Sequence, residues 1–130
     1  MNLNLSNFNY GNNFNINCDE TFGLGEGKSK ELVDSIGIDG VYLSHITKLN
    51  NMLRPFDKKI LMWGDIVCNH PQIIKKLPVD ITVIAWGYHP AESFDYAITP
   101  ISTTGLNFWI APGINCWRNI YPDLTDAEIN

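Results

Sequence analysis

Residues Phe14–Thr21 read FNINCDET, a short run that ends in two adjacent carboxylates, Asp19 and Glu20. A glycine-rich segment, residues 23–27 with the sequence GLGEG, follows at once. We interpret Phe14–Cys18 as a buried strand, and in α/β folds the residues after the carboxyl ends of parallel strands carry the chemistry. An acidic pair after a strand is also typical of a simple turn. The rest of the chain decides between the two interpretations.

Three further runs have the character of short buried strands, since they are mainly apolar and are followed by glycine or proline. Segments with apolar residues at helical spacing lie between them. The predicted strands are Phe14–Cys18, Ile60–Trp63, Ile81–Trp86 and Asn107–Ala111, and the predicted helices cover residues 28–36, 39–54, 70–77, 91–98 and 123–130. Asp39 is expected to be the N-cap of the second helix. This order predicts an α/β fold with a parallel sheet covered on both faces.

Each predicted strand ends in residues that suit a binding site. The strand ends carry Asp19-Glu20, Trp63-Gly64-Asp65, Trp86-Gly87-Tyr88 and Pro112-Gly113, with Trp117 shortly after the last. Such residues at the same end of successive strands are typical of a (β/α)8 TIM barrel. A complete barrel takes about 250 residues, and this chain has 130. We therefore expect a single domain, a partial TIM barrel of about four parallel strands, with residues 1–13 as an irregular lead-in.

The composition is that of a globular domain, with 45% apolar and 12% aromatic residues. The net charge of −5 gives no basic patch, so nucleic acid and anionic membrane surfaces are not expected partners. No apolar run reaches the roughly 18 residues that span a bilayer. The first residues, MNLNLSN, do not have the pattern of a signal peptide.

Neither a metal nor a cofactor is expected. Cys18, Cys68 and Cys116 are odd in number and far apart, which predicts no disulfide framework and no zinc site, with a reducing, cytoplasmic compartment as the default. The histidines are not spaced as a metal pair, and His45 is interpreted as a packed or surface residue of a helix. The chain has no phosphate loop, and GLGEG lacks the spacing of a dinucleotide fingerprint.

The motifs together resemble a known family. The segments that carry the resemblance are Asn15–Thr21, Leu24–Ser29, Met62–Asp65 and Ala85–Tyr88. In order and spacing they are similar to the family 20 glycoside hydrolases, which are β-N-acetylhexosaminidases. The resemblance covers roughly residues 14–120. It implies a glycan substrate that ends in a β-linked N-acetylhexosamine, either N-acetylglucosamine or N-acetylgalactosamine.

The resemblance also implies a mechanism with retention of configuration, in which the acetamido oxygen of the substrate attacks the anomeric carbon. Glu20 would protonate the leaving oxygen and later activate water. Asp19 would orient the acetamido N–H and offset the positive charge of the oxazolinium intermediate. Adjacent carboxylates raise each other's affinity for a proton, which suits Glu20 to the role of a general acid.

The expected substrate-binding residues are aromatic or polar. Trp63 and Trp86 would form the floor of the sugar site, with Asp65, Tyr88 and Trp117 beside the substrate. Each has a plainer interpretation: the tryptophans as core residues, Asp65 as a turn former, Tyr88 as a strand end and Trp117 as loop packing. Trp109, which falls inside a predicted strand, is expected in the core.

By the resemblance, these strands correspond to the fourth to seventh of the barrel, and Ala111-Pro112-Gly113 leaves the family's acetamido-contacting tyrosine unassigned. The strands that bring an arginine, a histidine and a last tryptophan and acid are not present. A half-barrel has two open edges, which predicts self-association or pairing with the missing barrel half, and an incomplete enzyme. The alternatives are a non-catalytic carbohydrate-binding fragment and a barrel hydrolase that uses Glu20 and Asp65 as two distant carboxylates.

Overall fold

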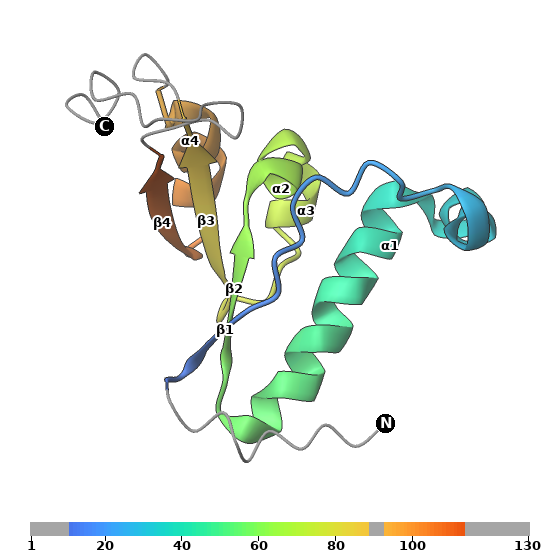
Figure 1. The fold of residues 1–130 in the computed structure, drawn as a ribbon, viewed down its shortest axis with the longest axis horizontal. Helices are drawn as coiled ribbons and strands as arrows, with labels where there is room; N and C mark the ends of the chain where they lie inside the picture. Colours follow the sequence, from blue (N-terminus) through green and yellow to red (C-terminus); the bar gives the residue numbers. More distant parts are fainter. Residues whose placement is uncertain (1–10, 89–92, 114–130) are drawn as a thin grey trace, which may run out of the picture.

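The computed structural model describes residues 11–88 and 93–113, and Trp117, Cys116 and the predicted helix at 123–130 lie outside them. In chain order the elements are β1 (Asn13–Asn15), the 3-10 turn η1 (Gly27–Ser29), α1 (Lys30–Leu53), η2 (Arg54–Phe56), β2 (Lys59–Trp63), α2 (Asp65–Asn69), α3 (Pro71–Ile74), β3 (Thr82–Gly87), α4 (Asp95–Ser102) and β4 (Asn107–Pro112). The sheet has the order β1-β2-β3-β4, and every neighbouring pair is parallel. The predicted α/β class with a four-stranded parallel sheet is thereby confirmed (Figure 1).

The strand predictions are confirmed with small shifts, except at the first strand. β1 ends at Asn15 instead of Cys18, because the backbone turns left-handed at Asn17 (φ 60°) and Cys18 (φ 69°). The residues that follow Asn15 remain hydrogen-bonded to β2. The Ile16 N–H donates to the Leu61 carbonyl at 3.0 Å, and the Trp63 N–H donates to the Asn17 carbonyl at 2.9 Å.

The two helices predicted on either side of Gly37 are both present, and they follow each other within α1 across a break in the helical geometry at Gly37. Gly37 has φ 75° and ψ 161°, a conformation that glycine adopts without the steric cost of a side chain. Asp39, expected as an N-cap, lies inside α1, and its Oδ1 is 2.8 Å from Nδ1 of His70. The second half of α1 packs on the sheet through the buried residues Tyr42 and Ile46.

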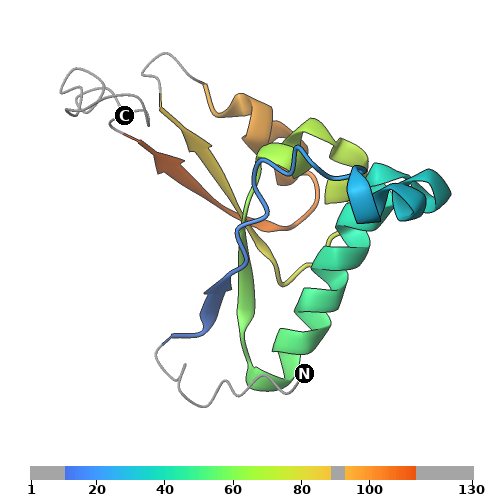
Figure 2. The same ribbon diagram turned by 45° about the vertical axis from the view of Figure 1, so that its right-hand side comes forward.

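The described helices gather on one side of the sheet, as Figure 2 shows. Side chains alternate between the two faces of a strand, so Met62 and Val83, which are both fully buried, face the helices. Trp63 and Ile84 pair in register and lie on the second face. The expectation that helices cover both faces is therefore wrong for the described residues.

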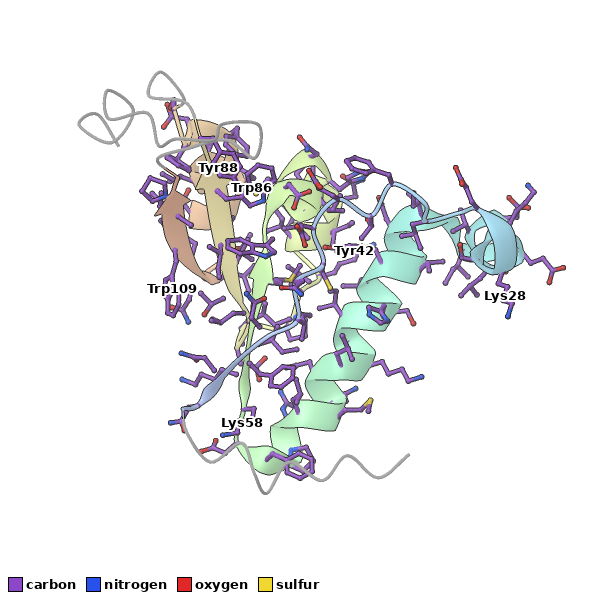
Figure 3. All side chains as sticks on the ribbon, viewed as in Figure 1. Lys28, Tyr42, Lys58, Trp86, Tyr88 and Trp109 are labelled. Carbon is purple, nitrogen blue, oxygen red and sulfur yellow. The ribbon has the colours of Figure 1, made fainter. Side chains whose placement is uncertain are left out.

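β4 lies at one edge of the sheet, and its apolar side chains are open to solvent. Trp109 is 49% exposed, so its expected place in the core is wrong. It pairs with Ile84 on the second face, where no described helix covers it (Figure 3). Phe108 and Ile110 point to the opposite face and are 36% and 43% exposed. His45 was interpreted as a packed or surface residue of a helix, and it is exposed on α1.

Candidate functional site

A cavity of about 380 Å³ lies at the carboxyl end of the sheet. Its walls come from the segment after β1 and from the ends of β2 and β3. The lining residues are Asn17, Asp19, Glu20, Trp63, Trp86 and Tyr88. Five of the seven residues that the sequence proposed for a site therefore meet in one cavity. Of the other two, Asp65 is not part of the lining, and Trp117 is outside the described residues.

The two carboxylates belong to a segment with an unusual backbone. Asn17, Cys18 and Glu20 have φ angles of 60°, 69° and 47°. Residues other than glycine rarely adopt this left-handed region, and each such residue costs on the order of 1 kcal/mol or more. A conformation of this kind persists only where neighbouring groups hold it, and it occurs preferentially at functional sites.

Three hydrogen bonds from three different elements hold this segment. From β2, the Trp63 N–H donates to the Asn17 carbonyl at 2.9 Å. From α1, the Tyr42 hydroxyl donates to the Cys18 carbonyl at 2.7 Å. From α2, Oδ2 of Asp65 accepts the Glu20 N–H at 3.0 Å. Tyr42 is only 4% exposed and lies between α1 and the segment (Figure 3).

The sequence alone did not assign a site role to Tyr42. A tyrosine at apolar helical spacing is most simply interpreted as a core residue, and Tyr42 does belong to the core. What distinguishes it is the hydroxyl, since the hydroxyl of a buried tyrosine usually has a hydrogen-bond partner. That signal was present in the sequence, but it does not say which carbonyl the hydroxyl binds.

A single glycine joins β2 to α2. The Gly64 N–H donates to the Ile84 carbonyl at 2.8 Å, which draws the turn against β3. A Cβ at Gly64 would lie 2.8 Å from Cγ1 of Val83 and 3.2 Å from the Ile84 carbonyl oxygen. The absence of a side chain thus lets the chain turn within one residue, with Trp63 in the cavity and Asp65 beside the backbone of Glu20.

The aromatic wall is built at the end of β3. The rings of Trp86 and Tyr88 have centroids 5.5 Å apart and an angle of 52° between their planes. Figure 3 shows both at the upper end of the sheet. The Trp86 carbonyl accepts a hydrogen bond from the Tyr96 hydroxyl at 2.9 Å, which ties this strand end to α4. Trp63 and Trp86 are half-buried rather than enclosed, so ring surface remains available to a ligand.

The surroundings of the cavity favour neutral side chains next to the carboxylates. Burial, followed by the charge of Asp19, raises the pKa of the Cys18 thiol. Burial and then the neighbouring charges raise the pKa of Tyr42, so its hydroxyl stays a donor at neutral pH. A thiol with a raised pKa is a poor nucleophile. Among the described residues, the carboxylic acids of the lining are Asp19 and Glu20, and this lining suits an uncharged, hydroxyl-rich ligand better than a phosphate.

A second hollow, of about 610 Å³, lies along α1 between Gly40 and Met52. It is wide open, and among the described residues of its lining Lys48 alone is ionisable. In residues 11–88 and 93–113, no cluster of three or more His, Cys, Asp or Glu residues is placed to hold a metal ion.

Within the described part of the chain, no helix is long and apolar enough to cross a membrane. Comparison with protein-family models, with curated proteins and with solved structures gives no significant match for this chain.

Proposed function

We propose that the cavity is the catalytic site of a glycoside hydrolase that removes terminal β-linked N-acetylhexosamine with retention of configuration. The observation that carries the proposal is the meeting of Asp19 and Glu20 with Trp63, Trp86 and Tyr88 in one cavity at the strand ends. Two carboxylates supply the acid–base chemistry of a glycosidase. Aromatic rings supply the flat apolar surface on which a sugar ring stacks.

The two carboxylates take different roles in this proposal. Glu20 gives its proton to the leaving oxygen while the acetamido oxygen of the substrate attacks the anomeric carbon. Asp19 accepts the acetamido N–H and balances the positive charge of the oxazolinium ring. Water then opens that ring and gives a proton to the Glu20 carboxylate, which restores the acid.

The aromatic wall sets the position of the sugar. In the proposed complex, the half-buried rings of Trp63 and Trp86 exclude water around the acetamido methyl group and the ring face. Tyr88 lies beside Trp86 and offers a hydroxyl to the substrate. The volume of about 380 Å³ is within the usual size range of small-molecule sites, which supports one monosaccharide unit as the group that enters.

We also propose that the sheet forms one part of a TIM barrel. The strands are parallel and adjacent in chain order, with the helices on one side, which is the arrangement of consecutive barrel strands. The exposed apolar residues of β4, such as Trp109, support further strands at that edge. These further strands would come from more of the same polypeptide, from another chain or from a second copy of this chain.

The test is hydrolysis by the full-length gene product of two para-nitrophenyl substrates, the N-acetyl-β-glucosaminide and the plain β-glucoside. The proposal predicts that only the acetamido sugar is cleaved, and that a thiazoline analogue of the oxazolinium intermediate inhibits. Cleavage of both substrates would instead indicate two distant carboxylates, such as Glu20 and Asp65. Binding of N-acetylglucosamine without any hydrolysis would indicate a carbohydrate-binding protein.

A further inference from the structure

We infer that Tyr42 and Asp65 are positioning residues, whose hydrogen bonds hold the segment Asn17–Glu20 in its left-handed conformation and thereby aim the two carboxylates into the cavity. This inference rests on the proposed function for what the carboxylates do. The conformation itself, and its dependence on the two side chains, can be measured without any substrate.

The geometry of Asp65 argues for a positioning role rather than contact with a sugar. One of its oxygens, Oδ2, accepts the backbone N–H of Glu20 at 3.0 Å. The other, Oδ1, is buried, and among the described residues it has no hydrogen-bond partner. Asp65 is also missing from the cavity lining. A ligand in the cavity would therefore meet the side chain of Glu20, with Asp65 behind its backbone.

Tyr42 acts on the same segment from the other side. Its hydroxyl donates to the carbonyl of Cys18 at 2.7 Å, and Cys18 directly precedes the carboxylate pair. The two bonds bracket Asp19, since one holds the residue before it and the other holds the residue after it. A hydrogen bond to a charged acceptor, as at Asp65, is stronger than one between neutral groups.

The two hydrogen bonds on either side of Asp19 matter because the backbone conformation that they hold is strained. Left-handed φ angles at Cys18 and Glu20 oppose the ordinary preference of these residues. Loss of either hydrogen bond lets the backbone relax toward a common conformation, and the direction of both carboxylates changes with it. Misplacement of catalytic groups by about 1 Å is enough to lower a rate by roughly 100-fold.

The first experiment measures hydrogen–deuterium exchange at the Glu20 amide, by mass spectrometry of the full-length gene product. We expect Asp65→Ala to speed exchange by about fivefold or more, the equivalent of one lost hydrogen bond. Tyr42→Phe should speed it as well. Tyr96→Phe is the matched control, because it removes a hydroxyl that binds the carbonyl of Trp86 and not the segment. Unchanged exchange in both Asp65→Ala and Tyr42→Phe would overturn the inference.

The second experiment compares Asp65→Asn with Asp65→Ala in the hydrolysis assay. The amide oxygen of asparagine can still accept the Glu20 N–H, so we expect Asp65→Asn to keep most of kcat. Asp65→Ala should lower kcat by about 10- to 100-fold with little change in KM. A rise in KM in both variants would make Asp65 a substrate contact and overturn its positioning role. If the wild type does not hydrolyse the substrate while exchange responds as expected, the proposed function fails and the positioning role stands.

Discussion

The backbone N–H of Glu20 donates a hydrogen bond to Oδ2 of Asp65, which lies 45 positions further along the chain. The bond joins the end of the first strand region to the start of α2. It gives the carboxylate of Asp65 a structural partner in the backbone of Glu20, whereas Asp65 is not among the residues that line the cavity. In the proposed account, the position of Glu20 therefore depends on a residue outside the cavity lining.

The first prediction concerns Glu20. Glu20→Gln keeps the shape of the side chain but cannot supply a proton, so kcat should fall by about 100- to 10,000-fold on substrates with a poor leaving group. The fall should be smaller with para-nitrophenolate, which leaves without protonation. The same substitution at Glu26, an exposed residue of the following loop, is the control and should leave the rate unchanged. Equal activity of the wild type and Glu20→Gln, on substrates with a poor leaving group as well as on the para-nitrophenyl substrate, would show that Glu20 is not the general acid.

Gly64 gives a prediction about stability. In Gly64→Ala the new Cβ would lie 2.8 Å from Cγ1 of Val83, so the turn has to shift. We expect a loss of about 1–3 kcal/mol in the free energy of unfolding, measured by urea denaturation. Gly23→Ala is the matched control, because its Cβ would have no atom within 4 Å. An equal effect of the two substitutions would contradict the close packing of Gly64 on β3.

Two apolar residues that pair in register on the same face of the sheet are predicted to contribute differently to stability, because they differ in burial. Ile84 is 6% exposed and Trp109 is 49% exposed. Ile84→Ala should lower the free energy of unfolding of this chain by about 2–5 kcal/mol. Trp109→Ala should cost less, despite the larger side chain, since much of the ring is already in contact with water. A cost at Trp109 as large as at Ile84 would show that β4 is covered in solution.

Cys68 provides a prediction about pH. Burial, and then the charge of Asp65, raises the pKa of this thiol from 9.0 to about 11, so the folded state favours the neutral form. The stabilisation is complete below pH 9, where the unfolded thiol is still protonated, and it is lost as the pH rises from 9 to about 11. Within that window the free energy of unfolding should fall by at most about 1.4 kcal/mol per pH unit from this group.

Urea denaturation across that pH window tests the effect of Cys68. Raised pKa values at Cys18 and Tyr42 act in the same direction, so the decline does not vanish when Cys68 is replaced. Cys68→Ala should nevertheless show a shallower decline than the wild type. Parallel curves for the two proteins would mean that Cys68 titrates at its ordinary pKa in the folded state.

Much of the fold could be predicted from the sequence, because local pattern and local structure agree. Ile60–Trp63 and Ile81–Trp86 are short apolar runs, and β2 and β3 form there within one residue at each end. The position of each strand within the sheet could not be predicted from the local pattern. Trp109 has the same local pattern as a core strand, but β4 is an edge strand, and only the tertiary arrangement shows that its rings are open to water.

The residues that line the cavity could be predicted from the sequence better than the interactions that hold them in place. The rule that strand ends converge at one edge was enough to bring Glu20, Trp63 and Trp86 together. The left-handed backbone at Cys18 and Glu20 had no sequence signal, since neither residue prefers that conformation. The hydrogen bond from the Tyr42 hydroxyl to the Cys18 carbonyl could not be predicted from the sequence either, because it joins a helix to a strand end 24 positions away.

The claim that the substrate's acetamido group is the nucleophile has one direct test. The full-length gene product is assayed on para-nitrophenyl β-glucosaminides whose N-acetyl group carries none, one, two or three fluorine atoms. Fluorine withdraws electrons from the acetamido oxygen and weakens it as a nucleophile. We predict that kcat/KM falls steeply with each added fluorine. Rates that do not depend on fluorination would contradict the proposal, because the attack would then come from the protein or from water.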